Sequence, residues 1–307
     1  MKVYDGLTDY VASAEEAEHV RRTLYRTDAS ARATVLPGYR TRLEPADLER
    51  FREQGYLAME GVLTSDEVLR CEAALDDLAR RRPEGVGAQE EPYYQRAGDE
   101  TGAVGPELRV RKLWKFAGVD PTLGAAVAAP RVTAILNQLI GPGARLIQDM
   151  ALMKPPHRGA EKPWHQDNAY FDWTPLDGVL GVWIALDPAT VENGCMQIAP
   201  GSHRAGPAPH YHVRDCQLVD QTSRAARAEV VPLGPGGGLF FSALLHHGTP
   251  PNRSPDRRRA LQFHYAAAGC QRMTFREHMA HFALGGAYVG CRDWDMEAGV
   301  SRARLSP

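Results

Sequence analysis

From residue 145 onward the chain alternates apolar and polar residues with a period of two, which is the period of a β-strand. Short clusters of Gly, Pro, Asn and Asp separate the alternating segments. The strands predicted on this basis are residues 145–154, 179–186, 194–198, 228–232, 237–242 and 258–266. Many short strands joined by such turns favour a β-sandwich or jelly roll over a parallel α/β sheet. The sequence contains neither a dinucleotide-binding nor a phosphate-loop motif.

The first part of the chain carries helical signals instead. Pro45 suits the first turn of a helix over residues 43–55, and Gly55 suits its end. Thr64 and Glu67 have the spacing of a capping box, which starts a second helix. The other predicted elements are a helix over 8–25, strands over 56–62 and 108–116, a loop over 85–105, and a helical segment over 121–141 that breaks near Pro130. We therefore expect an N-terminal extension over residues 1–42 and one mainly β domain over 43–307, with helices in its N-terminal part.

The charge of the chain is nearly balanced, with 36 basic and 38 acidic side chains. This balance gives no reason to expect a nucleic acid or a membrane surface as partner. No apolar run is long enough to cross a bilayer, and the first residues lack the apolar core of a signal peptide. The five cysteines are scattered, which suits free thiols in a reducing cytoplasm. We expect a cytoplasmic protein, and the sequence leaves its oligomeric state open.

One short segment offers two metal ligands. His165 and Asp167 are two positions apart, and residues i and i+2 of an extended backbone point to the same face. Both side chains can therefore reach one ion, and two His with one carboxylate form the ligand set of non-heme Fe(II) oxygenases. Because such a triplet often occurs by chance, a purely structural hydrogen bond between the two is the alternative. The hypothesis needs a third ligand.

A pair of histidines far downstream offers that ligand. His246 and His247 are adjacent, so on a strand they face opposite ways and only one of them can join the first two residues. Three arginines, residues 257–259, then open the next predicted strand. An Fe(II) oxygenase needs a two-electron donor such as 2-oxoglutarate, and the planar fork of a guanidinium fits its far carboxylate. An Arg at this place therefore has a chemical use.

The chain resembles the phytanoyl-CoA dioxygenase family of Fe(II)- and 2-oxoglutarate-dependent oxygenases from about residue 43 to residue 266. The matching blocks are residues 154–156 (KPP), 164–167 (WHQD), 181–186 (GVWIAL), 193–196 (NGCM) and 200–203 (PGSH), then 247–249 (HGT) with Asn252, Ser254 and 258–260 (RRA). The resemblance implies a double-stranded β-helix core, which is a cupin-like jelly roll flanked by N-terminal helices. It also implies Fe(II) as cofactor, with 2-oxoglutarate and O₂ as co-substrates.

The resemblance assigns roles by position. It implies that His165, Asp167 and His247 bind the metal, because the family's Gly, Asn and Arg are spaced from His247. Arg258 would then bind the far carboxylate of 2-oxoglutarate, helped by the hydroxyl of Thr249. The other co-substrate candidates are Trp183, Met150, Lys112 and Gln148. For Trp183 the alternative is plain core packing, and for Lys112 it is an ordinary solvated lysine.

The residues after the ligand pair are candidates for the substrate pocket. Tyr170, Phe171 and Trp173 are predicted pocket walls, with core packing as the alternative. His210 lies in a Pro-rich loop that is a further candidate wall. A second metal site in that loop is disfavoured, because His203 belongs to the family's Pro-Gly-Ser-His turn.

The expected function is hydroxylation of an unactivated C–H bond of a small molecule. Halogenation is disfavoured, because halogenating oxygenases leave the carboxylate position empty and this chain has Asp167. The alternatives are desaturation, epoxidation, ring closure or epimerisation with the same cofactors, or a non-catalytic metal-binding protein of the same fold. The Ala- and Arg-rich composition indicates a GC-rich bacterial genome, in which tailoring of natural products is the expected role.

Overall fold

The main β-sheet of the computed structural model has eight strands, in the order β1-β2-β13-β8-β15-β5-β4-β3. The structure describes residues 14–97, 104–212, 215–219, 222–283, 294–295 and 300–301. The strands of this sheet are β1 Val35–Leu36, β2 Tyr56–Met59, β3 Gly87–Glu90, β4 Val110–Trp114, β5 Arg145–Lys154, β8 Val179–Ala185, β13 Gly238–Ser242 and β15 Arg258–Ala266. Neighbouring strands are antiparallel, except that β1 and β2 are parallel.

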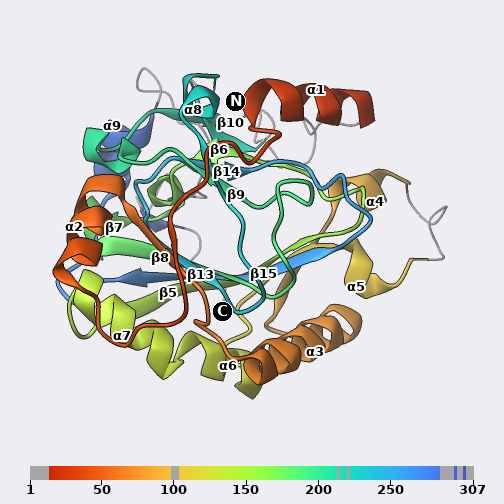
Figure 1. Ribbon diagram of the computed structural model, residues 1–307, viewed down its shortest axis with the longest axis horizontal. Helices are drawn as coiled ribbons and strands as arrows, with labels where there is room; N and C mark the ends of the chain where they lie inside the picture. Colours follow the sequence, from red (N-terminus) through yellow and green to blue (C-terminus); the bar gives the residue numbers. More distant parts are fainter. Residues whose placement is uncertain are drawn as a thin grey trace.

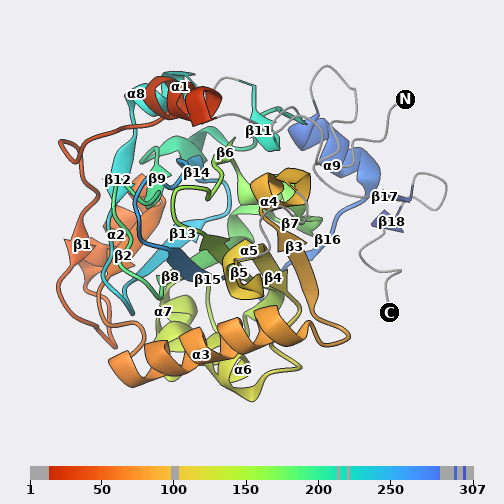
Figure 2. The ribbon, with the colours of Figure 1, turned by 90° about the vertical axis from the view of Figure 1, so that its right-hand side faces the viewer.

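A smaller sheet lies against one face of the main sheet (Figures 1 and 2). Its order is β12-β9-β14-β6, formed by Glu229–Val231, Met196–Ile198, His247–Thr249 and Lys162–His165. The two-stranded pairs are β7 Trp173–Thr174 with β16 Gln271–Arg272, β10 His210–His212 with β11 Cys216–Leu218, and β17 Trp294–Asp295 with β18 Val300–Ser301. Two mainly antiparallel sheets packed face to face are the architecture predicted from the period-two strands.

Helices cover the opposite face of the main sheet. In Figure 1, α3 (Ser65–Arg81), α6 (Pro121–Val127) and α7 (Pro130–Leu139) lie along this face. The strands are buried on both faces, so alternate residues serve two cores: Val182 packs with helix residues such as Leu75, whereas Trp183 packs with residues of the smaller sheet such as Met196. The other helices are α1 Ala14–Leu24, α2 Pro45–Gln54, α4 Pro92–Ala97, α5 Pro106–Arg109, α8 Thr222–Ala226 and α9 Phe275–Phe282, and the 3-10 helices are η2 Asp167–Tyr170, η3 Leu176–Gly178 and η4 Ser202–Ala205.

The predicted helix signals are confirmed where the structure describes them. Gly55 ends α2 with a left-handed φ of 80°, a backbone conformation that favours glycine. The side chain of Thr64 accepts a hydrogen bond from the backbone of Glu67, and the Glu67 carboxylate accepts one from the backbone of Thr64. The predicted break before Pro130 separates α6 from α7. Of the helix predicted over residues 8–25, the part up to residue 13 lies outside the described residues.

The predicted loop over residues 85–105 is wrong in part. The structure places β3 and α4 there, while residues 98–103 lie outside the described part. β3 is a four-residue edge strand whose composition gives no clear period, so only its pairing with β4 reveals it. The domain boundary at residue 42 stays a prediction. On the N-terminal side of that boundary, β1 extends the main sheet and Tyr25 packs on Trp164 with ring centroids 6.0 Å apart.

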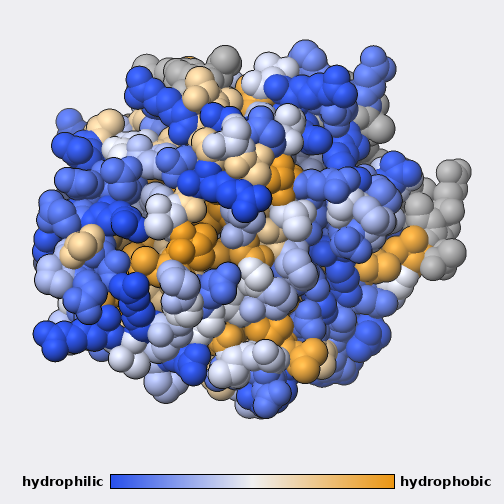
Figure 3. All heavy atoms as spheres, viewed as in Figure 1, coloured by the Kyte–Doolittle hydropathy of each residue, from blue (hydrophilic) through white to orange (hydrophobic). Residues whose placement is uncertain are grey.

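The expectation of free thiols is correct for three cysteines and wrong for one. Cys71, Cys195 and Cys270 are free and buried, whereas Cys216 is disulfide-bonded. None of the described helices has the length and apolar character that a bilayer-spanning segment requires. On the face shown in Figure 3, hydrophilic side chains cover most of the surface, and apolar ones gather in separate small areas.

Candidate functional site

His165 and His247 lie on the smaller sheet, and Asp167 lies just beyond its edge strand β6. His165 is the last residue of β6, Asp167 opens η2, and His247 is the first residue of β14. β6 and β14 are antiparallel neighbours in which His247 stands opposite His165, so strand pairing joins residues that are distant in the sequence. Gln166 has an extended backbone, which turns Asp167 to the same side as His165.

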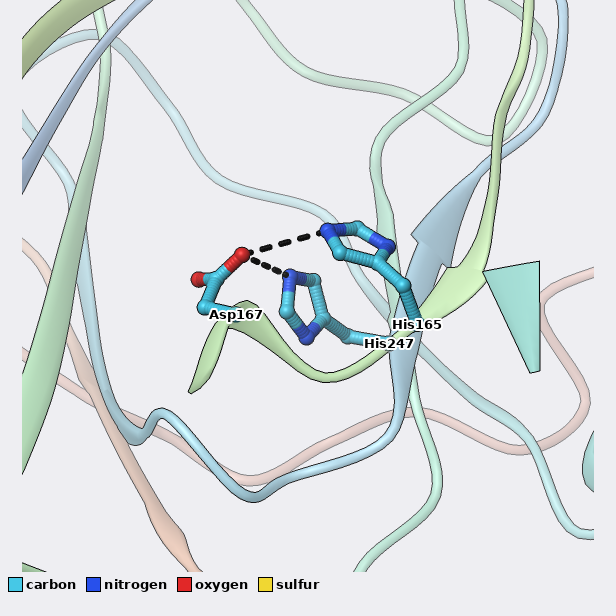
Figure 4. Close-up of side chains that lie close together, drawn as sticks. All are labelled: His165, Asp167 and His247. Carbon is cyan, nitrogen blue, oxygen red and sulfur yellow. Dashed lines mark hydrogen bonds and ion pairs between the residues drawn. The ribbon is translucent and has the colours of Figure 1, made fainter. Parts of the chain in front are cut away.

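The three side chains point their donor atoms at one another (Figure 4). Asp167 Oδ1 is 3.1 Å from His165 Nε2 and 3.5 Å from His247 Nε2. One donor atom from each side chain lies within 4.8 Å of the other two, and all three residues are buried. Ligand atoms that share one ion at about 2.0–2.2 Å have a mutual spacing of this order.

The outer nitrogens of both rings carry the protons. His165 Nδ1 is 2.7 Å from the carbonyl oxygen of Pro163, and His247 Nδ1 is 2.9 Å from that of Leu245. A carbonyl oxygen only accepts, so each Nδ1–H donates and Nε2 of a neutral ring keeps its lone pair. Burial, followed by the repulsion from His247, lowers the pKa of His165 to about 4, so this ring is neutral at pH 7. Lone pairs on nitrogen and on the Asp167 carboxylate therefore face each other, an arrangement that a cation between them stabilises.

The carboxylate is ionised at this site. Burial alone would raise the pKa of Asp167, but the neighbouring imidazoles of His247 and His264 hold that pKa well below its usual value. Neutral imidazole and ionised carboxylate are the forms that bind a metal. His246 is not part of this group of donor atoms. It lies just before β14, and its backbone N–H donates to Ser202 Oγ at 2.8 Å.

A cavity of about 170 Å³ opens beside the triad, between the two sheets. Its walls include the predicted residues Lys112, Gln148, Met150, Thr249, Arg258, Tyr170 and Phe171. Strand register explains why most of the co-substrate candidates gather here. Gln262 of β15 stands opposite Met150 of β5 and Trp183 of β8, and Lys112 of β4 stands opposite Leu152 of β5. Residues directly opposite each other on neighbouring strands face the same side of a sheet.

Arg258 lines this cavity and forms no ion pair with a carboxylate of the described residues. The residue is 1% exposed, and its guanidinium carbon is 5.5 Å from the centroid of the Trp183 ring. Nη1 donates to the carbonyl of Leu152 at 3.3 Å, and Nε has no hydrogen-bond partner among the described residues. Burial lowers its pKa to about 10, so it is still cationic at pH 7. A buried cation of this kind needs an anion, and the carboxylate of a ligand fits it.

Two further basic side chains of the cavity wall do have partners, and the sequence did not reveal them. Arg111 Nη1 lies 3.2 Å from Glu91 Oε1. Lys162 Nζ lies 2.6 Å from Asp215 Oδ2 and 2.5 Å from Tyr170 Oη. Both acidic partners are far from their bases in the sequence, so no local pattern connects them.

Trp173 and His210 contact other parts of the structure, and their role as substrate-pocket walls stays a prediction. The Trp173 ring lies close to the guanidinium carbons of Arg145, at 5.1 Å, and Arg272, at 4.0 Å. His210 Nε2 accepts the backbone N–H of Gln166 at 2.9 Å. Neither residue is among the described side chains that line the cavity. His210 therefore holds the backbone of Gln166, which lies between His165 and Asp167.

Two side chains that contact Asp167 were also missed. His264 Nε2 is 2.7 Å from Asp167 Oδ2, and Gln262 Nε2 is 3.3 Å from the same oxygen. Both lie on β15, four and six positions after Arg258, and therefore on the same face. Counting every second residue from Arg258 along this predicted strand would have indicated that Gln262 and His264 face the same side.

A family model described as phytanoyl-CoA dioxygenase (PhyH) matches residues 51–260 of the chain. The mouse protein phytanoyl-CoA dioxygenase domain-containing protein 1 is 30% identical over 264 residues, which cover 74% of this chain and 91% of the mouse protein. Among solved structures, the non-heme alpha ketoglutarate dependent carbocyclase SnoK from nogalamycin biosynthesis is 25% identical with a TM-score of 0.60, over 76% of this chain and 87% of SnoK. EvdO2 from Micromonospora carbonacea var. aurantiaca, solved with 2-oxoglutarate, is 26% identical with a TM-score of 0.53, over 76% of this chain and 94% of EvdO2.

These similarities confirm the predicted jelly-roll fold and the dependence on iron and 2-oxoglutarate. The family match covers more than half of the chain and includes both stretches that carry the triad. The chain belongs to the phytanoyl-CoA dioxygenase family and is a non-heme iron- and 2-oxoglutarate-dependent dioxygenase.

Proposed function

We propose that this enzyme hydroxylates an unactivated C–H bond of a small molecule, with His165, Asp167 and His247 as the iron ligands. One observation carries the proposal: a single cavity holds three donor atoms turned to one point and a buried guanidinium that pairs with none of the described carboxylates. The first feature fits iron(II), and the second fits the far carboxylate of 2-oxoglutarate.

The residues of the chain bind and orient the reactants. Iron with 2-oxoglutarate and O₂ supplies the oxidising power, because 2-oxoglutarate is decarboxylated to succinate as the substrate is oxidised. Arg258 and the hydroxyl of Thr249 hold the far carboxylate in the buried part of the cavity. Met150 packs along the carbon chain of 2-oxoglutarate, Gln148 offers an amide on the same cavity wall, and the Trp183 ring packs behind the Arg258 guanidinium.

The space for the substrate adjoins His165. The Tyr170 ring stands edge-on to the His165 ring with centroids 5.8 Å apart, and Phe171 lines the same cavity. Ring closure is the second candidate outcome, because SnoK is a carbocyclase at 25% identity. That protein acts in nogalamycin biosynthesis, which supports a role in bacterial natural-product tailoring. A cytoplasmic location and the absence of a nucleic-acid partner stay predictions.

Succinate release tests the proposal. The protein is loaded with Fe(II) under anaerobic conditions, mixed with 2-oxoglutarate and O₂, and offered a panel of polyketide, sugar and acyl-thioester substrates. We expect succinate above the background of free iron, and a product that gains one oxygen atom. A product that instead loses two hydrogen atoms would identify ring closure or desaturation. Protein that takes up iron but never forms succinate would refute the proposal.

Lys112 should make 2-oxoglutarate binding depend on pH. Burial lowers its pKa to about 7, and it has no ion pair with a described residue. Binding of a dianion favours the charged form of Lys112, so the proton is taken up above pH 7. We therefore expect affinity for 2-oxoglutarate to fall between about pH 7 and pH 9, by at most about tenfold per pH unit.

Calorimetry in two buffers of different ionisation enthalpy measures this proton uptake. Lys112→Met should bind 2-oxoglutarate more weakly and without proton uptake at pH 8. Lys115→Met, an exposed lysine just after the same strand, is the matched control and should behave like the wild type. Equal proton uptake by Lys112→Met and the wild type would show that another group titrates.

A further inference from the structure

The two oxygens of the Asp167 carboxylate have different surroundings. Oδ1 faces the Nε2 atoms of His165 and His247, at 3.1 and 3.5 Å. Oδ2 lies 2.7 Å from His264 Nε2 and 3.3 Å from Gln262 Nε2. A carboxylate only accepts hydrogen bonds, so His264 Nε2 carries a proton and donates a hydrogen bond to Oδ2. Only Oδ1 is left facing the point where the other two ligands meet.

The fold holds His264 in this position. It lies on β15, which has a strand on either side, and it is 1% exposed. Its ring packs on Phe171 with centroids 4.7 Å apart. The register between β15 and β5 shifts directly after His264, and such bulges re-aim side chains beside active sites. The imidazole is therefore fixed by the centre of the main sheet, independently of the smaller sheet that carries the triad.

His264 is not a fourth ligand in this arrangement. It is outside the group of described side chains whose donor atoms lie within 4.8 Å of one another. Its Nε2 is already taken by Oδ2 of Asp167. The residue lines the cavity and touches the ligand set only through that carboxylate. Its geometry is that of an outer partner that orients a ligand.

We infer that His264 is a positioning residue that keeps Asp167 a ligand through one oxygen. A carboxylate bound through both oxygens would take one more coordination position of the metal. Two His and one singly bound carboxylate leave three positions open, of which 2-oxoglutarate takes two and one remains for O₂. This inference rests on the proposed iron site, and it explains how that site keeps room for its co-substrates.

Two substitutions at one position separate positioning from folding. His264→Leu removes the donor, and His264→Gln keeps an N–H that can reach the same oxygen. Mn(II) affinity is measured by anaerobic calorimetry without 2-oxoglutarate, and the visible charge-transfer band of the Fe(II)–2-oxoglutarate chelate is recorded separately. We expect His264→Leu to lose about 10- to 100-fold in Mn(II) affinity, the usual cost of an outer partner, and to show a weakened or shifted band. His264→Gln should recover most of both signals.

His203→Leu is the matched control, because that ring binds the backbone carbonyl of Arg52 and does not line the cavity. It should leave Mn(II) affinity and the band unchanged. The inference is overturned if folded His264→Leu binds Mn(II) and forms the band like the wild type, or if His264→Gln is as impaired as His264→Leu. Wild-type protein that forms no chelate at all would instead refute the proposed iron site, so the two failures are distinguishable.

Discussion

Replacing Asp167 with Ala is expected to abolish succinate release and to lower iron affinity by at least about 100-fold. Loss of an outer partner of a metal ligand already lowers metal affinity by about 10- to 100-fold, and loss of a ligand should cost more. Asp167 is the one anion in the donor group, and it faces the two imidazoles of His165 and His247. Without it, two neutral nitrogens would have to hold a dication in a buried site, where uncompensated charge is costly. The carboxylate also receives hydrogen bonds from His264 and Gln262, so its loss leaves those donors without their acceptor.

The measurement is iron content after anaerobic reconstitution and desalting, followed by succinate assay. Asp177→Ala is the matched control, because this exposed aspartate lies ten positions further on and outside the cavity wall. It should keep iron and turnover. Thermal unfolding of both variants without metal shows whether Asp167→Ala is folded. An Asp167→Ala protein that retains iron and turns over normally would remove this residue from the ligand set.

The sequence was sufficient for the local half of the site and insufficient for the rest. His165 and Asp167 share a face because Gln166 is extended, and an i, i+2 spacing predicts that directly. Between His246 and His247, strand alternation says only that one is excluded. Which one depends on the register of β14 against β6, a pairing between segments about 80 positions apart. Family spacing supplied that choice, and local physics did not.

The missed residues share one cause. Lys162 forms an ion pair with Asp215, and Arg111 forms one with Glu91. The partners are too far apart in the sequence for a helix or strand period to connect them. Trp173 shows the opposite case, because it lies near His165 and Asp167 in the sequence but is not among the described side chains that line the cavity. The chain turns through η2 after Asp167, and Trp173 then pairs with Arg272 of β16. Nearness in sequence was therefore a poor guide once the chain left the extended segment.

Three short strands were absent from the predicted strand ranges for a related reason. β3, β6 and β14 have three or four residues each, too few for a period of two to stand out. β6 and β14 nevertheless carry His165 and His247, so the two strands that hold the site were absent from the predicted ranges, whereas β9 and β12 of the same sheet were predicted. The long central strands β5, β8 and β15 were predicted within about two residues of their bounds, because their apolar residues serve both faces of the main sheet.

Arg258→Met is expected to raise the dissociation constant for 2-oxoglutarate by roughly 100-fold, which corresponds to about 2.7 kcal/mol. Loss of one partner of a buried, hydrogen-bonded charge pair costs about 2–5 kcal/mol, and a fork-like donor pair is lost here. Met keeps an unbranched apolar side chain and removes the guanidinium, with its charge and its hydrogen bond to the Leu152 carbonyl. At saturating 2-oxoglutarate the rate of succinate formation should fall much less than the affinity. Anaerobic titration of the Fe(II) protein, followed by the charge-transfer band, gives the constant.

The neighbouring arginine provides the crossed control. Arg259 points to the other face of β15 and contacts Asp187, Glu72 and Asp76, at 2.8, 2.6 and 3.2 Å. Arg259→Met leaves these carboxylates without their cation, so the protein should unfold at lower temperature while its affinity for 2-oxoglutarate stays close to that of the wild type. Arg258→Met should bind 2-oxoglutarate more weakly while its unfolding temperature stays close to that of the wild type. Arg258 forms no ion pair with a described carboxylate before 2-oxoglutarate binds, so its loss removes none from the protein. If both variants lost affinity in parallel with stability, the effect of Arg258 would be structural, and the anchor for the far carboxylate would have to be sought elsewhere in the cavity.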